Sequence, residues 1–164
     1  MLKTKDYQKF TDFKFISLEG MYEGSKVVLE NLEYNLINII NTETPITLNT
    51  LKQRLREALN VKKISQKALD IIEDKIKKLG FYETDNLYDK VYWPASGEFR
   101  VKELRINYTR QVYDIPYQEL GNLVNVIEES GEKLHREILK YFGYEVLTEK
   151  ASNYLKFIED IIRN

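Results

Sequence analysis

The chain has 164 residues, of which 43% are hydrophobic and 31% are charged. This length and composition fit one ordinary globular domain or two very small ones, and the absence of cysteine excludes disulfides and thiolate metal sites. The net charge of −1 argues, taken alone, against a strongly electrostatic partner such as DNA.

The first 44 residues predict an arm and a helix. Residues 1–26 have scattered aromatics and no sustained periodicity, with Gly20 and Gly24 as breakers, so we expect an extended arm anchored by its Phe and Tyr side chains. From Val27, apolar residues recur at helical spacing, which predicts a helix that ends before Pro45.

Two further helices and a hairpin follow. Thr47 or Asn49 can cap a helix running to about Leu59, and after a tight turn Ser65 can cap a third helix that ends at Gly80. The segment 81–93, "FYETDNLYDKVYW", has aromatic and β-branched residues on either side of an Asp-Asn turn signal and predicts a two-stranded hairpin. Together, residues 27–93 predict a winged helix-turn-helix.

The remaining residues predict a linker and a second helical unit. We expect a linker over 94–114, within which "RVKELRINY" has the alternation of a strand, and helices over 115–164. Segment 51–72 aligns without a gap with 134–155, an offset of 83 that pairs Leu51 with Leu134 and Ser65 with Thr148. The prediction is therefore a mainly α (α+β) fold, a winged helix-turn-helix followed by a wingless degenerate copy packed on it.

Charge is distributed unevenly over the two copies. Residues 45–80 carry nine Lys/Arg and four Asp/Glu, a local +5, whereas residues 111–164 carry six and ten, a local −4. Two interpretations fit this distribution: the basic first copy faces an anion and the acidic second copy does not, or both charged segments are ordinary solvated helix faces.

Catalytic motifs are scarce. "YEGSKVV" lacks the first glycine of a phosphate loop, and the single histidine, His135, aligns with Lys52 and is expected to be solvated. Acidic clusters near 70–74 and 128–132 are interpreted as solvated helix faces. We therefore expect no enzyme, cofactor or metal.

A DNA site fits the pattern better, because the start of the third helix of a helix-turn-helix enters the major groove. Phosphate and base contacts would come from the turn, the start of that helix and the wing. The candidate residues are Lys62, Lys63, Ser65, Gln66, Lys67 and Lys90, with the ring edges of Tyr88 and Tyr92. Asp70, Glu73 and Asp74 would repel a duplex further along the helix.

The aromatic residues are interpreted mainly as packing groups. Trp93 is expected in the crease between the two units, in preference to base stacking, and Tyr141, Tyr144 and Tyr154 are expected at an interface or in the core.

Four segments together resemble a known family: "TPITLNTLKQRL", "NVKKISQKALDIIEDKI", "VYWPASGEFRV" and "RQVYDIPYQEL". The family is a domain of unknown function found near the C-terminus of superfamily I DNA helicase-like proteins, often beside a very-short-patch-repair-type endonuclease domain. The resemblance covers roughly residues 30–164. It departs at the turn, which is Arg-rich in the family and here has Lys63, Gln66 and Lys67, so bidentate arginine contacts to phosphate are weakened to point charges.

Two functions remain open. The first, which the family resemblance implies, is a non-catalytic nucleic-acid-binding accessory domain with DNA at the basic first unit and a helicase or nuclease domain as partner. The second is a protein-interaction or dimerisation module, built on winged-helix units that do not bind DNA. Such a module would pair with a partner protein or with a second copy of this chain as a homodimer. With no signal peptide and no apolar run of about 18–20 residues, we expect a cytoplasmic protein without membrane contact.

Overall fold

A computed structural model describes residues 1–164 and has a mixed α and β fold, with 52% helix and 10% strand. The expected α+β class is confirmed. The chain divides into two compact units, which we name for where most of their residues lie. The N-terminal unit comprises residues 8–84 and 90–98, and the C-terminal unit comprises residues 1–7, 85–89 and 99–164. Each unit has its own hydrophobic core.

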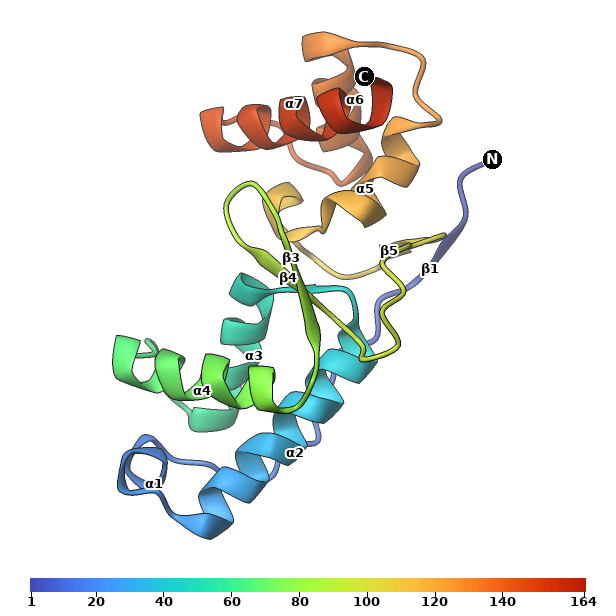
Figure 1. The fold of residues 1–164 in the computed structure, drawn as a ribbon. Coiled ribbons are helices and arrows are strands. Elements are labelled where there is room, and N and C mark those ends of the chain that lie inside the picture. The colour runs from blue at the N-terminus through green and yellow to red at the C-terminus, as the bar shows by residue number, and fades with distance from the viewer. The chain divides into compact units, whose positions relative to one another are not determined.

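The N-terminal unit contains four helices and a small sheet (Figure 1). The helices are α1 (Leu18–Glu23), α2 (Lys26–Glu43), α3 (Leu48–Leu59) and α4 (Gln66–Lys78). The strands are β2 (Ile46–Thr47), β4 (Lys90–Trp93) and β3 (Tyr82–Asp85), in that spatial order. The three helices predicted between Val27 and Gly80 and the hairpin after them are all present, and Thr47 and Ser65 are the caps.

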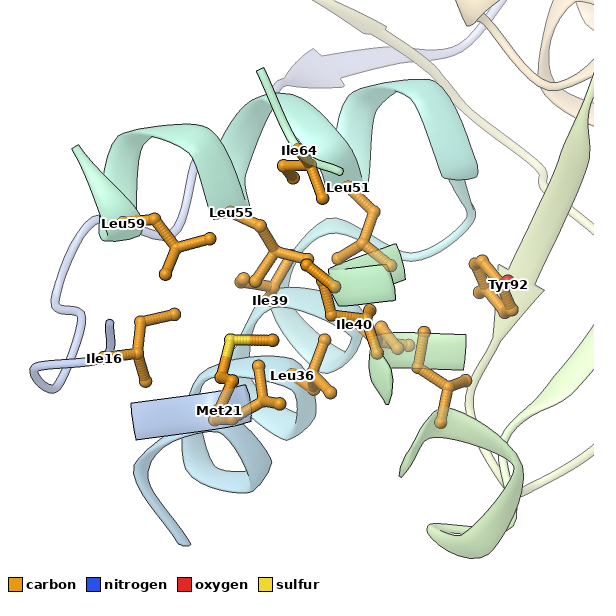
Figure 2. Close-up of a cluster of buried hydrophobic side chains, with 14 of the residues drawn as sticks. Ile16, Met21, Leu36, Ile39, Ile40, Leu51, Leu55, Leu59, Ile64 and Tyr92 are labelled. Carbon is orange, nitrogen blue, oxygen red and sulfur yellow. The ribbon is translucent and has the colours of Figure 1, made fainter. Parts of the chain in front are cut away.

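The core of this unit forms where α2 and α3 meet. Leu36, Ile39 and Ile40 of α2 are fully buried and point towards Leu51 and Leu55 of α3 (Figure 2). Burying each such side chain contributes about 1.5–3 kcal/mol. The helical spacing of these residues therefore determines which faces of the two helices pack together.

The arm before α2 is held by backbone hydrogen bonds to a buried side chain. The Lys14 amide donates to Asn35 Oδ1 at 2.8 Å, and Asn35 Nδ2 donates back to the Lys14 carbonyl at 2.9 Å. The expectation that the arm is extended throughout is wrong at α1, which Ser17 caps. Gly20 is no breaker there, because a Cβ at this position would lie 2.5 Å from Val28 Cγ2, so glycine allows α1 to approach α2.

The C-terminal unit contains three helices, a 3-10 turn and a two-stranded parallel ladder. The helices are α5 (Tyr117–Val124), α6 (Gly131–Tyr141) and α7 (Glu149–Arg163), and the 3-10 helix η1 is Val112–Asp114. Strand β1 (Thr4–Asp6) pairs with β5 (Leu104–Ile106). The sequence gives no signal of this pairing, because its two strands are three residues long and about a hundred residues apart.

The predicted linker contributes a buried charge cluster to this unit. Arg105 and Arg110 each lie 2.7 Å from an oxygen of Glu119, and all three side chains are buried. Burial alone would raise the pKa of Glu119, but hydrogen bonds from Arg110 and the charge of Arg105 outweigh it and lower that pKa from 4.5 to about 2. Residues 104–114 therefore belong to the folded unit and are not a connector.

Candidate nucleic-acid interface

The turn between α3 and α4 is fixed at both ends by backbone geometry. Asn60 adopts a left-handed conformation with φ of 55°, and the amide of Val61 donates to the Arg56 carbonyl at 3.1 Å, which closes α3. Ser65 Oγ accepts from the Ala68 amide at 3.1 Å and opens α4. Ile64 is buried between them, so the neighbouring lysines face outwards.

Five of the six predicted site residues are gathered at this turn. All five have exposed side chains on the turn or the first turn of α4: Lys62, Lys63, Ser65, Gln66 and Lys67. The sixth, Lys90, does not lie at this turn but begins strand β4 of the hairpin. Its Nζ lies 3.6 Å from carboxylate oxygens of both Glu73 and Glu83, so its charge is already compensated within the unit.

The acids of α4 are engaged by their own neighbours. Asp70 accepts from Gln66 Nε2 at 2.8 Å, Asp74 pairs with Lys78 at 2.9 Å, and Glu73 pairs with Lys90. The lysines at 62, 63 and 67 form no ion pair. The repulsion that the sequence predicts along α4 is therefore reduced, and the turn keeps its positive charge.

An open groove of about 520 Å³ lies beside the turn. Its lining residues are Gln53, Arg56, Glu57, Asn60, Val61 and Lys62. Glu57 is neutralised by Lys9 at 3.1 Å, whereas Arg56 has no acidic partner. Sequence reasoning missed Gln53 and Arg56, although their spacing of three residues places both on one face of α3.

The arm adds a residue that the sequence analysis also missed. The hydroxyl of Tyr22, in α1, lies 2.5 Å from Ser65 Oγ, and Lys67 Nζ lies 4.6 Å from the centre of its ring. These contacts place an aromatic side chain directly over two of the predicted DNA-binding residues. No periodicity in residues 1–26 could have indicated this position.

Several other side chains are buried. Arg54, one of the nine Lys/Arg of residues 45–80, is fully buried and binds both oxygens of Glu43. Tyr92 is 2% exposed and cannot offer a ring edge to DNA. Trp93 is 1% exposed and donates from Nε1 to Thr84 Oγ1 at 2.8 Å, so burial is confirmed and base stacking is excluded. Strand β4 of the hairpin therefore offers fewer side chains for contact with DNA than the sequence predicts.

His135 is not solvated as predicted. It is 5% exposed, and its Nε2 lies 3.1 Å from Glu159 Oε1. Glu159 also accepts from the Gly131 amide and lies near Arg163. Burial opposes ionisation of Glu159, but the Gly131 hydrogen bond and the nearby His135 and Arg163 outweigh it and lower its pKa. Lys52, with which His135 aligns, is only half-buried. The aligned helix faces of the two units therefore differ in burial.

The contrast in charge is smaller in the folded units than in the sequence windows. The N-terminal unit has 13 Lys/Arg and 12 Asp/Glu, a net +1, and the C-terminal unit has 12 and 14, a net −2. Residues 45–80 leave out Glu43, which neutralises the buried Arg54. Residues 111–164 leave out Arg105 and Arg110, which neutralise the buried Glu119. The local arrangement at the turn, and not the overall charge of the unit, therefore decides whether an anion can bind.

No group of three or more His, Asp or Glu side chains is arranged to hold a metal ion. None of the helices combines the length and apolar character needed to cross a membrane.

Comparison of the chain with protein-family models, with curated proteins and with solved structures finds no match in any of the three. The family resemblance therefore stays a prediction.

Proposed function

We propose that the N-terminal unit is a winged helix-turn-helix that binds nucleic acid at the α3–α4 turn without catalysing a reaction. The carrying observation is that Lys62, Lys63 and Lys67 gather there without ion-pair partners, while Glu73 and Asp74 of α4 are paired with Lys90 and Lys78. Such lysines release counterions from the phosphate backbone on binding.

The arrangement of elements supports this assignment. Helices α3 and α4 are joined by a six-residue turn, 60–65, and a hairpin follows α4. In a helix-turn-helix, the start of the second helix lies in the major groove, which here brings Gln66 and Lys67 to base edges or phosphates. Arg56, across the groove, adds a further phosphate contact. Lys90 contributes less than the others because Glu73 and Glu83 already bind it.

The role as an accessory domain rests on the family resemblance, which is an associational argument. In that role the chain would hold duplex or forked DNA beside a helicase or nuclease domain of the same or another protein.

The test is fluorescence anisotropy of labelled duplex, forked and single-stranded DNA at two salt concentrations. The variant Lys62→Ala/Lys63→Ala/Lys67→Ala should weaken duplex binding and lower the salt slope by about three units at most. The matched control, Lys77→Ala/Lys102→Ala/Lys156→Ala, removes the same charge from exposed positions away from the turn and should leave the slope nearly unchanged. Absence of duplex binding at low salt would overturn the proposal and favour the protein-interaction module.

A further inference from the structure

An open depression in the C-terminal unit is lined with aromatic rings. It has a volume of about 870 Å³ and is open to solvent. Two stretches of chain, 106–110 and 141–144, form its walls and bring four rings to it. These rings belong to Tyr108, Tyr141, Phe142 and Tyr144.

The rings are held in place by the buried charge cluster. Tyr108 stacks on Tyr7 with ring centres 4.7 Å apart and planes at 18°. The guanidinium groups of Arg105 and Arg110 lie 4.7 and 4.9 Å from the centre of the Tyr7 ring, and both are bound by Glu119. Tyr108 therefore rests on a rigid stack, which lowers the entropic cost of stacking another ring against this wall.

The opposite wall is also ordered. The Tyr144 hydroxyl donates to the Arg110 carbonyl, which ties the two stretches together. Tyr141 packs edge-on against Phe142 with ring centres 5.2 Å apart, and 45% of Tyr141 remains exposed. Tyr141 is therefore not a core residue, whereas the fully buried Tyr154 does belong to the core.

A second groove, of about 350 Å³, shares Tyr144 with the aromatic depression. Its other lining residues are Arg136, Leu139, Lys140 and Glu145. All five lie 83 positions after residues that line the groove beside the α3–α4 turn. The two grooves therefore lie at matching places in the two units, but their cations differ in position, because Arg136 and Lys140 align with Gln53 and Glu57.

Local charge does not oppose an anion here. The segment 131–146 has three basic and three acidic side chains, and Glu132 is bound by Arg136 at 2.7 Å. The net −4 of residues 111–164 comes from acids outside this segment, among them Asp114 and Glu119, which are buried. The net acidity of residues 111–164 therefore does not extend to the segment beside the groove.

We infer that the aromatic depression and the adjoining groove bind single-stranded nucleic acid. Bases stack on Tyr108 and Tyr141, the side chain of Thr109 meets base edges, and the phosphates pass Lys140. Arg136 and Asn107 contribute less, because Glu132 already binds Arg136 and Asp6 already binds Asn107. A duplex is excluded from this role, because its bases already stack on one another and cannot reach the rings. This site lies in the other unit from the α3–α4 turn and does not depend on the proposed function.

The test is a titration of labelled ~12-nucleotide oligo-dT, a length within the usual site sizes for single strands, with the full chain. Replacing Tyr141 by Ala should weaken binding about tenfold, because stacking of one base is lost, and Tyr141→Phe should retain it. Lys140→Ala should weaken binding and reduce its salt dependence by about one unit. The control is Tyr82→Ala, which removes a ring of similar exposure, 49%, from the N-terminal unit.

Two further results separate this site from the turn. The Lys62→Ala/Lys63→Ala/Lys67→Ala variant should bind oligo-dT as the natural chain does, and Tyr141→Ala should bind duplex DNA unchanged. Failure of the natural chain to bind oligo-dT at low salt, or equal binding by Tyr141→Ala and the natural chain, would overturn the inference. Loss of oligo-dT binding in the triple-lysine variant would assign the single strand to the turn and would equally overturn it.

Discussion

Ser65 and Thr148 cap α4 and α7 with the same geometry. Each side-chain oxygen accepts from the amide three residues later at 3.1 Å. Their backbone angles are −68° and 159° for Ser65 and −71° and 160° for Thr148. The two caps therefore share one local geometry at the offset of 83.

The preceding helix ends agree in the same way. Asn60 and Gly143 are both left-handed, with φ of 55° and 81°. Val61 donates to the Arg56 carbonyl, and Tyr144 donates to the Leu139 carbonyl at the same offset. The helix end and the following cap are therefore equivalent in both units, while the surface residues differ.

The two caps predict a measurable loss of stability. Ser65→Ala and Thr148→Ala should each lower the free energy of unfolding by about 1 kcal/mol, because an amide in the first turn loses its acceptor. Ser65→Ala should cost more than Thr148→Ala, since Ser65 also bonds to Tyr22. Urea denaturation followed by circular dichroism measures both. Ser152→Ala, one turn inside α7, is the control, and an equally large loss there would contradict the capping argument.

The buried pair of Glu43 and Arg54 predicts a larger loss. Arg54→Leu should destabilise the N-terminal unit by about 3–5 kcal/mol, because it leaves the Glu43 carboxylate buried without its partner. The double variant Glu43→Leu/Arg54→Leu should recover much of that loss, since no charge then remains to be buried. Urea unfolding of the single and double variants gives the coupling energy. Arg56→Ala, at a half-buried position of the same helix that forms no ion pair, should change stability by less than about 1 kcal/mol.

Regular helices and their caps could be predicted from the sequence because apolar spacing and polar cap residues are local signals. The helix predicted from Val27 spans Lys26–Glu43, Ser65 caps α4 as predicted, and Thr148, which the alignment pairs with Ser65, caps α7. The ladder between β1 and β5 and the contacts of Glu119 could not be predicted. They join residues distant in sequence, and a single sequence does not indicate which acidic side chain pairs with which basic side chain.

The grouping of residues at the candidate site could be predicted in part for the same reason. The residues of the turn are contiguous, so Lys62, Lys63 and Lys67 were grouped correctly. Whether a lysine keeps its charge available depends on distant partners, and Lys90 is bound by acids that the pattern did not place beside it. Tyr22 reaches the site through α1, whose helical turn depends on how closely Gly20 packs against Val28.

Glu119 predicts how stability depends on pH. Its pKa in the folded chain, about 2, lies below the ordinary value of 4.5, so ionised Glu119 stabilises the fold above pH 4.5. This contribution, about 3 kcal/mol, should be lost as the pH falls from about 4.5 to about 2. The free energy of unfolding, measured by urea at several pH values, should fall more steeply in this interval for the natural chain than for Glu119→Gln. Parallel curves would show that Arg105 and Arg110 do not hold the carboxylate ionised.

Tyr22 predicts that the arm weakens nucleic-acid binding at the turn. Its hydroxyl occupies Ser65 and its ring attracts the Lys67 ammonium group, so both residues must leave these contacts to meet a phosphate. Tyr22→Ala should therefore tighten duplex binding about two- to fivefold, which corresponds to the ~0.5–1 kcal/mol of an exposed cation–π contact. Tyr22→Phe removes the hydroxyl alone and should have a smaller effect. Anisotropy titration of duplex DNA measures both, with Phe15→Ala, an exposed ring on the same arm, as the control. Weaker binding by Tyr22→Ala would mean that the tyrosine contacts the nucleic acid itself, and the turn would then be a surface that the arm completes.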